Sequence, residues 1–111
     1  MIEGVGIDIV NVKQFKSLIS DKFILKYFSK EEKNLEKQSL AGRFAAREAL
    51  YKAMNDQKEF KLEDIEITTK GKPQFIFKNS MAIFFSQYRV HLSISNLDSF
   101  SIAIVLIEKA I

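Results

Sequence analysis

An alanine-rich stretch at residues 42–53 constrains the fold of this chain more than any other segment. Ala, Leu, Arg, Glu and Lys all favour the helical state, and we expect a helix from about residue 39 to residue 54. At about 100° per residue, the alanines cover one side of this helix. A helix that is apolar on nearly every side is typically buried. The opposite side is apolar as well, because it carries Leu40, Phe44, Tyr51 and Met54.

Four charged side chains interrupt this apolar helix. Glu48 and Lys52 are one turn apart, and Arg43 and Arg47 form a second charged pair on another edge. The simplest interpretation of Glu48 and Lys52 is an exposed ion pair worth about 0.2–0.5 kcal/mol. The alternative is a notch floored by alanines, in which a cation and a polyanionic ligand bind. The alanines favour the notch, because a solvated face would normally carry long polar side chains there.

Residues 2–10 alternate as a β-strand that carries Gly4, Gly6 and Asp8 on one face. Glycine weakens a strand and often marks the close approach of another backbone or a ligand. Aspartate is also poorly suited to a strand. Asp8 therefore either starts the helix that follows or serves a function, and the residues alone leave both interpretations open.

The remaining hydrophobic periodicity predicts both helices and strands, and hence a mixed architecture. We expect one α+β domain over residues 1–111, in which a mostly antiparallel sheet packs against the long central helix. The predicted helices cover 11–20, 21–28 and 81–88, with a short exposed helix after a capping box at 29–32, and the predicted strands cover 65–69, 74–77, 90–95 and 101–108.

Composition excludes several classes of protein. The chain is 47% hydrophobic with ten phenylalanines, which excludes disorder. It has no cysteine and one histidine, which argues against disulfides and zinc. We find no P-loop, no recognisable triad nucleophile, no membrane span and no signal peptide, so a cytoplasmic protein is expected. A net charge of +3 suits an acidic partner or a phosphorylated substrate.

The stretch Arg-Phe-Ala-Ala-Arg-Glu-Ala-Leu-Tyr-Lys-Ala at residues 43–53 resembles the signature helix of the holo-(acyl carrier protein) synthases, the small 4′-phosphopantetheinyl transferases. Three further stretches resemble motifs of that family, in the same order: residues 6–10, 71–73 and 91–96. The resemblance spans nearly the whole chain and implies the fold of that family. The chain departs from the family at Gln14, at the polar loop 55–58 where a glycine-rich turn is common, and at Asn96, where a histidine normally stands.

The resemblance implies Mg²⁺-dependent transfer of 4′-phosphopantetheine from coenzyme A to a serine of acyl carrier protein, in fatty acid biosynthesis. Asp8 and Glu48 would be the metal ligands, and Glu48 and Lys52 the catalytic residues. Lys52 would steady the departing phosphate group. The carrier serine is the nucleophile, which leaves Glu48 and a metal-bound hydroxide as candidates to accept its proton.

The resemblance also implies contacts with both substrates. Carrier protein would dock on lysines of the first two helices, Lys13, Lys22 and Lys26. The family forms homotrimers with active sites between subunits, so a homotrimer is expected here. Coenzyme A would contact Arg43, Lys52, Gly71, Lys72, Pro73, Ser93, Ser95 and Asn96.

Two alternatives come from other classes of protein. The basic pI near 9.1 and the aromatic residues would suit a small nucleic-acid-binding module. Against this, Phe75 and Phe77 have the strand parity of core residues, and there is no RNP-type motif. The other is a catalytically silent interaction domain of the same fold, which the missing histidine and glycine-rich turn would suit. We expect neither nucleic acid nor membrane as a partner.

Overall fold

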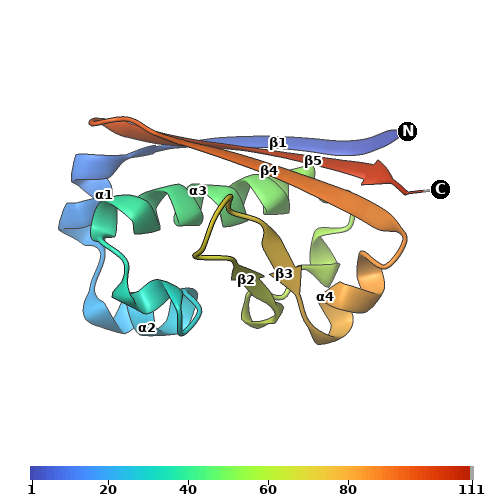
Figure 1. Cartoon of the computed structure of the whole chain (residues 1–111), viewed down its shortest axis with the longest axis horizontal. Helices are drawn as coiled ribbons and strands as arrows, with labels where there is room; N and C mark the ends of the chain where they lie inside the picture. The colour runs from blue at the N-terminus through green and yellow to red at the C-terminus, as the bar shows by residue number, and fades with distance from the viewer. Residues whose placement is uncertain (111) are drawn as a thin grey trace.

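A three-stranded antiparallel sheet crossed on one face by a long helix forms the framework of the molecule (Figure 1). The computed structural model describes residues 1–110. The strands lie in the order β1-β5-β4, and α3 packs along the sheet, which confirms the α+β architecture predicted from sequence. These elements are β1 (Ile2–Asn11), β5 (Phe100–Lys109), β4 (Tyr88–Asn96) and α3 (Lys37–Ala53).

Smaller elements cover the other side of α3, and the β2–β3 hairpin is one of them (Figure 1). The predicted helix over 81–88 is displaced towards the N-terminus, because Tyr88 already pairs with Lys109 in the sheet. The helix predicted from residue 11 begins at Val12, and Asn11 caps it, because its side chain accepts from the Gln14 N–H at 2.9 Å. These elements are α1 (Val12–Leu18), α2 (Asp21–Tyr27), η1 (Glu32–Asn34), η2 (Gln57–Glu59), η3 (Leu62–Asp64), β2 (Ile65–Ile67), β3 (Phe75–Phe77) and α4 (Asn79–Phe84).

The central helix is buried, as its composition predicts. Ala45, Ala46, Ala49 and Leu50 are fully buried in a core that α3 shares with the sheet and the hairpin. A second core cluster lies at the N-terminal end of α3, beneath α1 and α2, and contains Val12, Phe15, Phe28, Leu40 and Ala41. Small side chains on α3 let the helix approach the sheet closely.

The backbones of β1 and α3 touch at two glycines. A Cβ added at Gly6 would lie 1.9 Å from the carbonyl oxygen of Ala49, and one at Gly4 would lie 1.9 Å from that of Ala53. Neither oxygen can move, because both belong to the helix backbone. The glycines of the N-terminal strand are thus explained by close approach of another backbone. Asp8, two residues further along the same face, is brought beside α3 by this contact.

We expect Gly6→Ala to destabilise the protein by at least about 3 kcal/mol, because the added methyl group must push β1 away from α3. Urea unfolding followed by circular dichroism measures the change. Gly71→Ala is the matched control. At Gly71 nothing lies within 4 Å of an added Cβ, and only its φ of 69° is unfavourable, at a cost of about 1–2 kcal/mol. Equal losses at the two positions would contradict the close contact.

The segment after α2 differs from its prediction. The capping box is present, since the Ser29 N–H donates to Glu32 Oε1 at 3.1 Å and the Glu32 N–H donates to Ser29 Oγ at 3.4 Å. The segment is not the exposed helix expected, however. It is the single turn η1, and Glu32 is fully buried against two arginines of α3. The local charge pattern gave no sign of these distant partners.

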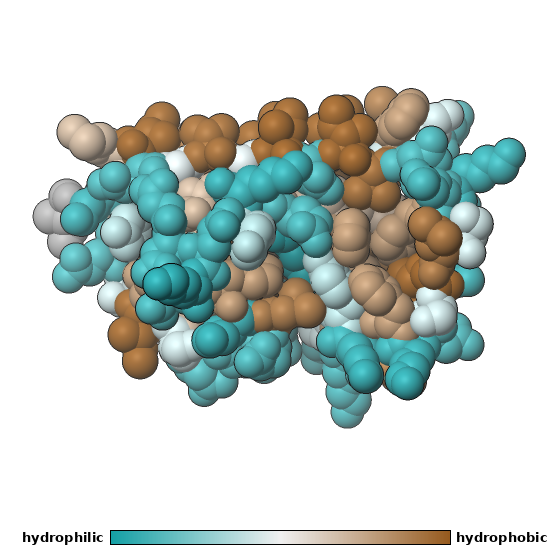
Figure 2. Space-filling model, turned by 180° about the vertical axis from the view of Figure 1, so that it is seen from behind, coloured by the Kyte–Doolittle hydropathy of each residue, from teal (hydrophilic) through white to brown (hydrophobic). Residues whose placement is uncertain are grey.

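The other face of the sheet is apolar and exposed. Figure 2 shows it as a brown band along one edge of the molecule. Ile7 and Ile9 are 51% and 59% exposed, although both are β-branched apolar residues. We call this surface the outer sheet face. According to the β1–β5 register, the residues on this face are Val5, Ile7, Ile9, Ile102, Ile104 and Leu106. None of the helices within residues 1–110 has the length and apolarity needed to cross a bilayer.

Candidate active site

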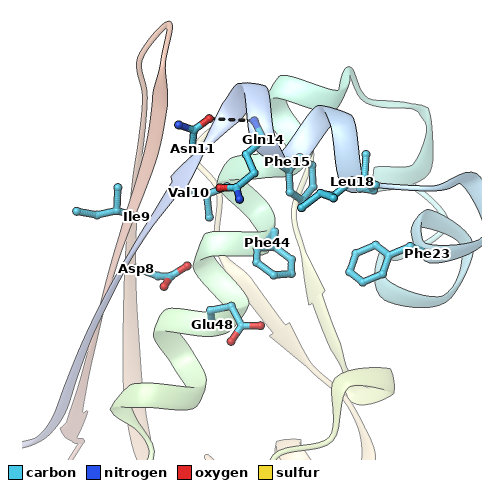
Figure 3. A pocket seen from close by; sticks show the side chains of 11 residues that line it. Asp8, Ile9, Val10, Asn11, Gln14, Phe15, Leu18, Phe23, Phe44 and Glu48 are labelled. Carbon is cyan, nitrogen blue, oxygen red and sulfur yellow. Dashed lines mark hydrogen bonds between the residues drawn. The ribbon is translucent and has the colours of Figure 1, made fainter.

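A cleft of about 480 Å³ runs along α3 beside the β1 edge of the sheet (Figure 3). The carboxylates of Asp8 from β1 and Glu48 from α3 both line it, on the same side of the helix. The rest of its lining is largely apolar and includes Phe15, Leu18, Ile19, Phe23 and Phe44. Two acidic side chains 40 residues apart in the sequence therefore share one cleft.

Lys52 joins this site through Asp8 and not through Glu48. Its ammonium nitrogen lies 2.9 Å from Asp8 Oδ1 and donates to the Ile7 carbonyl at 3.1 Å. The simple i,i+4 pair with Glu48 does not form among the ion pairs of residues 1–110. The Asp8 side chain is 17% exposed, which makes the pair partly buried on its acidic side.

Glu48 accepts a hydrogen bond from the Tyr27 hydroxyl at 3.4 Å. Burial raises the pKa of Tyr27, and the neighbouring Glu48 carboxylate raises it further, while Arg47 opposes the shift. Tyr27 is therefore a neutral phenol that donates to Glu48 at ordinary pH. Tyr27 was not among the site residues expected from the sequence. Helical spacing gave no signal for it, because the two side chains come from different helices 21 residues apart.

Both arginines of α3 turn away from the cleft into a buried network. Arg47 is fully buried and pairs with Glu32 through both of its terminal nitrogens, one of them 3.1 Å from Oε2. Arg43 Nη1 lies 3.3 Å from Glu32 Oε2, and the same guanidinium donates to the carbonyls of Ile67 and Thr68. Arg43 was expected to contact substrate. In the structure it belongs to this buried network with Glu32, and 9% of its side chain is exposed.

The charge of Glu32 is maintained by its partners. Burial alone would raise the pKa of Glu32, but the hydrogen bond and charge of Arg47, with bonds from Ser29, hold it below its ordinary value of 4.5. A lowered pKa means that the ionised carboxylate is more favoured in the folded protein than in the unfolded chain. Its contribution to stability is present above pH 4.5 and is lost as the pH falls through the folded-state pKa.

Of the residues expected at coenzyme A, Lys52 joins the site through its pair with Asp8, whereas those of the turn at 71–73 do not line the cleft. Gly71 and Lys72 are exposed in the β2–β3 turn, where Pro73 is half-buried. The turn is held by Thr68, whose hydroxyl donates to the Lys72 carbonyl at 3.2 Å.

The strand motif at 91–96 is also separate from the cleft. Ser93 and Ser95 are exposed and pair with Ile104 and Ile102 on the outer sheet face. Asn96 accepts from the Ser101 hydroxyl at 2.9 Å, and its amide oxygen lies next to Gly42 of α3.

The positions expected to dock carrier protein are Lys13, Lys22 and Lys26, and all three are exposed on α1 and α2.

Phe75 and Phe77 do not form an open platform for stacking bases. Their rings stack on one another at 5.5 Å, and Phe77 stacks on the buried Phe85 at 4.5 Å. Both are half-buried members of the main core. The structure thus confirms the core placement of both rings that strand parity predicted. Among residues 1–110, no three or more His, Cys, Asp or Glu side chains gather as a metal cluster.

Comparison with known proteins defines the class. Residues 4–105 match the family described as the 4′-phosphopantetheinyl transferase superfamily. A holo-[acyl-carrier-protein] synthase of Clostridium kluyveri is 38% identical over 122 residues, covering 97% of this chain and 91% of the relative. A holo-(acyl-carrier-protein) synthase of Bacillus anthracis, solved in complex with CoA (3′,5′-ADP), is 35% identical with a TM-score of 0.80 and 98% coverage of both chains. The Helicobacter pylori synthase, solved with coenzyme A, has a TM-score of 0.77 at 28% identity, covering 94% of this chain and 99% of its own.

The chain belongs to the 4′-phosphopantetheinyl transferase superfamily. Its curated relatives there are holo-[acyl-carrier-protein] synthases, which confirms the resemblance inferred from the signature helix and its accompanying motifs. The predictions of a phosphopantetheinyl transferase and of its fold are confirmed with it.

Proposed function

We propose that this chain transfers the 4′-phosphopantetheine group of coenzyme A to a serine of apo acyl carrier protein, in the cytoplasm and for fatty acid biosynthesis. The observation that carries the proposal is that Asp8 and Glu48 line one cleft and that Lys52 pairs with Asp8. The names of the relatives support the two substrates, because several are holo-[acyl-carrier-protein] synthases and two solved neighbours hold coenzyme A or its nucleotide part.

The residues present fit a magnesium ion. Magnesium is usually held by one or two carboxylates, with waters and substrate phosphates completing its octahedron. Asp8 and Glu48 supply two carboxylates, and each has one oxygen engaged by a neighbour, Lys52 or Tyr27. The other oxygen of each is the one we assign to the cation. A bound ion at this position would neutralise the charge of the diphosphate during phosphoryl transfer.

Lys52 is assigned to the leaving group in this proposal. The Lys52 side chain is 53% exposed, so it can turn from Asp8 to a phosphate oxygen and stabilise the leaving adenosine 3′,5′-bisphosphate. The carrier serine supplies the nucleophilic oxygen, which forms the new phosphoester bond as the diphosphate bond breaks. The chain therefore needs no nucleophile of its own, and none was recognised in the sequence.

Mass spectrometry of the carrier protein tests the proposal. Unmodified acyl carrier protein, coenzyme A and Mg²⁺ are mixed with the protein, and the carrier mass is followed with time. We expect the carrier to gain one phosphopantetheine group, and to gain none when Mg²⁺ is replaced by a chelator. A carrier mass that stays unchanged in the complete mixture would overturn the transferase assignment and favour the silent interaction domain.

We also propose that the outer sheet face joins three copies of this chain. Its exposed isoleucines form an apolar surface of the kind that marks protein interfaces. Ser93 and Ser95 lie on this same face, and a single chain keeps them away from Asp8 and Glu48. A neighbouring copy on this face can bring its substrate-contact residues to the cleft of the first, because β1 belongs to both surfaces.

The oligomeric state gives a direct prediction. We expect sedimentation velocity to show a species of three times the chain mass of 12.8 kDa. Ile7→Asp places a charge on the outer sheet face and should dissociate this species. Ile83→Asp is the control, since Ile83 is 76% exposed on α4, outside that face. Dissociation by both substitutions, or a wild-type monomer, would contradict the proposed interface.

Carrier docking is assigned to α1 and α2. Lys13, Lys22 and Lys26 are exposed there, beside the apolar side chains of Leu18 and Leu25, which are also exposed. A basic and apolar surface next to the cleft suits an acidic partner that must deliver a serine into it. Such attraction is electrostatic, so it should weaken as ionic strength rises.

Reversing two of these charges should raise the KM for carrier protein. For Lys22→Glu with Lys26→Glu we expect an increase of about tenfold at low salt, with kcat nearly unchanged. Lys109→Glu is the control, because β5 carries Lys109 at the end of the sheet opposite α1. Initial rates at several salt concentrations provide the readout. An equal effect of the control, or a salt-independent KM, would contradict docking on these helices.

A further inference from the structure

Glu48 lacks a cationic partner among the ion pairs of the described residues. Lys52 is directed to Asp8, and both arginines of α3 are directed to Glu32. The Glu48 side chain accepts a hydrogen bond from the Tyr27 hydroxyl, at 3.4 Å to Oε1. Glu48 is half-buried at the cleft, and a glutamate side chain has several staggered rotamers to choose from. Tyr27 is therefore the contact that selects one of them.

Tyr27 is itself firmly placed. Its ring packs at 4.9 Å from that of Phe23, 5.0 Å from that of Phe28 and 5.1 Å from that of Phe44. The Arg47 guanidinium lies 5.7 Å from the centre of the same ring, and Arg47 is fixed by its buried pair with Glu32. The buried ion pair thus supports a ring whose hydroxyl reaches Glu48.

We propose that Tyr27 is a positioning residue, whose hydroxyl holds Oε1 of Glu48 so that the other carboxylate oxygen is presented to a divalent cation shared with Asp8. This rests on the proposed function, in which Asp8 and Glu48 bind the cation. Side chains that hydrogen-bond to a metal ligand commonly set its orientation, and their loss costs about 10–100-fold in metal affinity or activity. The packing of the ring alone does not need a hydroxyl, because phenylalanine would make the same three aromatic contacts.

Manganese binding followed by electron paramagnetic resonance tests this, with Mn²⁺ as the probe and no substrate present. We expect Tyr27→Phe to weaken Mn²⁺ binding about tenfold and to raise the Mg²⁺ concentration needed for half-maximal transfer by the same factor. The rate at saturating Mg²⁺ should remain close to that of the wild type. Tyr88→Phe is the matched control and should bind Mn²⁺ normally, because Tyr88 starts β4 and packs on Phe84 and Phe85.

A double-mutant cycle separates positioning from packing. In the Glu48→Gln background, Tyr27→Phe should cause no further loss of Mn²⁺ affinity, because the oriented oxygen is already gone. Normal Mn²⁺ binding by Tyr27→Phe, or an equal loss in the Glu48→Gln background, would overturn the role of Tyr27 alone. A wild-type protein whose Mn²⁺ binding is absent, or is unchanged by Glu48→Gln, would overturn the two-carboxylate site and this inference with it.

Discussion

Glu48→Gln is expected to lower the rate of phosphopantetheine transfer by about 10³-fold or more while leaving the protein folded. The substitution keeps the shape of the side chain and its contact with Tyr27, but removes the charge that would hold a cation beside Asp8. Loss of one preorganised electrostatic group at a reaction centre typically costs about 10²–10³-fold. Loss of a ligand from a site with only two protein carboxylates should cost at least as much.

The carrier mass assay measures this loss, and circular dichroism verifies the fold. Glu63→Gln is the control, since Glu63 is an exposed residue of η3 and should leave the rate unchanged. Transfer at the wild-type rate by Glu48→Gln would remove Glu48 from the catalytic site.

Glu32→Gln is expected to destabilise the protein by about 3–5 kcal/mol at neutral pH. The carboxylate of Glu32 is fully buried and pairs with two arginines, and its loss leaves both guanidinium groups without a counter-charge. Urea unfolding at pH 7 measures the change, and Glu31→Gln, at the exposed neighbouring residue, is the control. A loss below about 1 kcal/mol would mean that the network contributes little.

The difference in unfolding free energy between the wild type and Glu32→Gln should also depend on pH. Because the folded-state pKa of Glu32 lies below its ordinary value of 4.5, the wild type keeps its advantage above pH 4.5. The advantage should shrink as the pH falls through the lowered pKa, where the wild-type carboxyl becomes neutral like the amide. A difference in stability that stays constant from pH 7 to pH 3 would contradict the lowered pKa.

The parts of this site that sequence could predict are those that depend on periodicity within one element. The alanines of α3 indicated a buried helix, and strand parity placed Asp8 on the same face as Gly4 and Gly6. Those glycines then proved to be the points where β1 touches α3, which explains why Asp8 comes to lie beside the helix. Periodicity alone left the role of Asp8 open, and it was the family resemblance that paired Asp8 with Glu48 as metal ligands.

What the sequence could not predict depends on contacts between distant segments. Helical spacing paired Glu48 with Lys52, but the close approach of β1 offers Lys52 both Asp8 and a carbonyl. Glu32 was expected on an exposed helix, yet it lies in the core with arginines 11 and 15 residues further along the chain. The role of Tyr27 gave no signal in the sequence, because nothing in its own helix shows that its hydroxyl meets Glu48.

The location of a bound divalent cation tests the central claim most directly. Crystals grown with Mn²⁺ and measured near its absorption edge would show where the ion sits. We expect one anomalous peak in the cleft, about 2.1 Å from a carboxylate oxygen of Asp8 and from one of Glu48. A fully occupied peak elsewhere on the chain, with the Asp8–Lys52 pair unchanged and no density between the two carboxylates, would contradict the account.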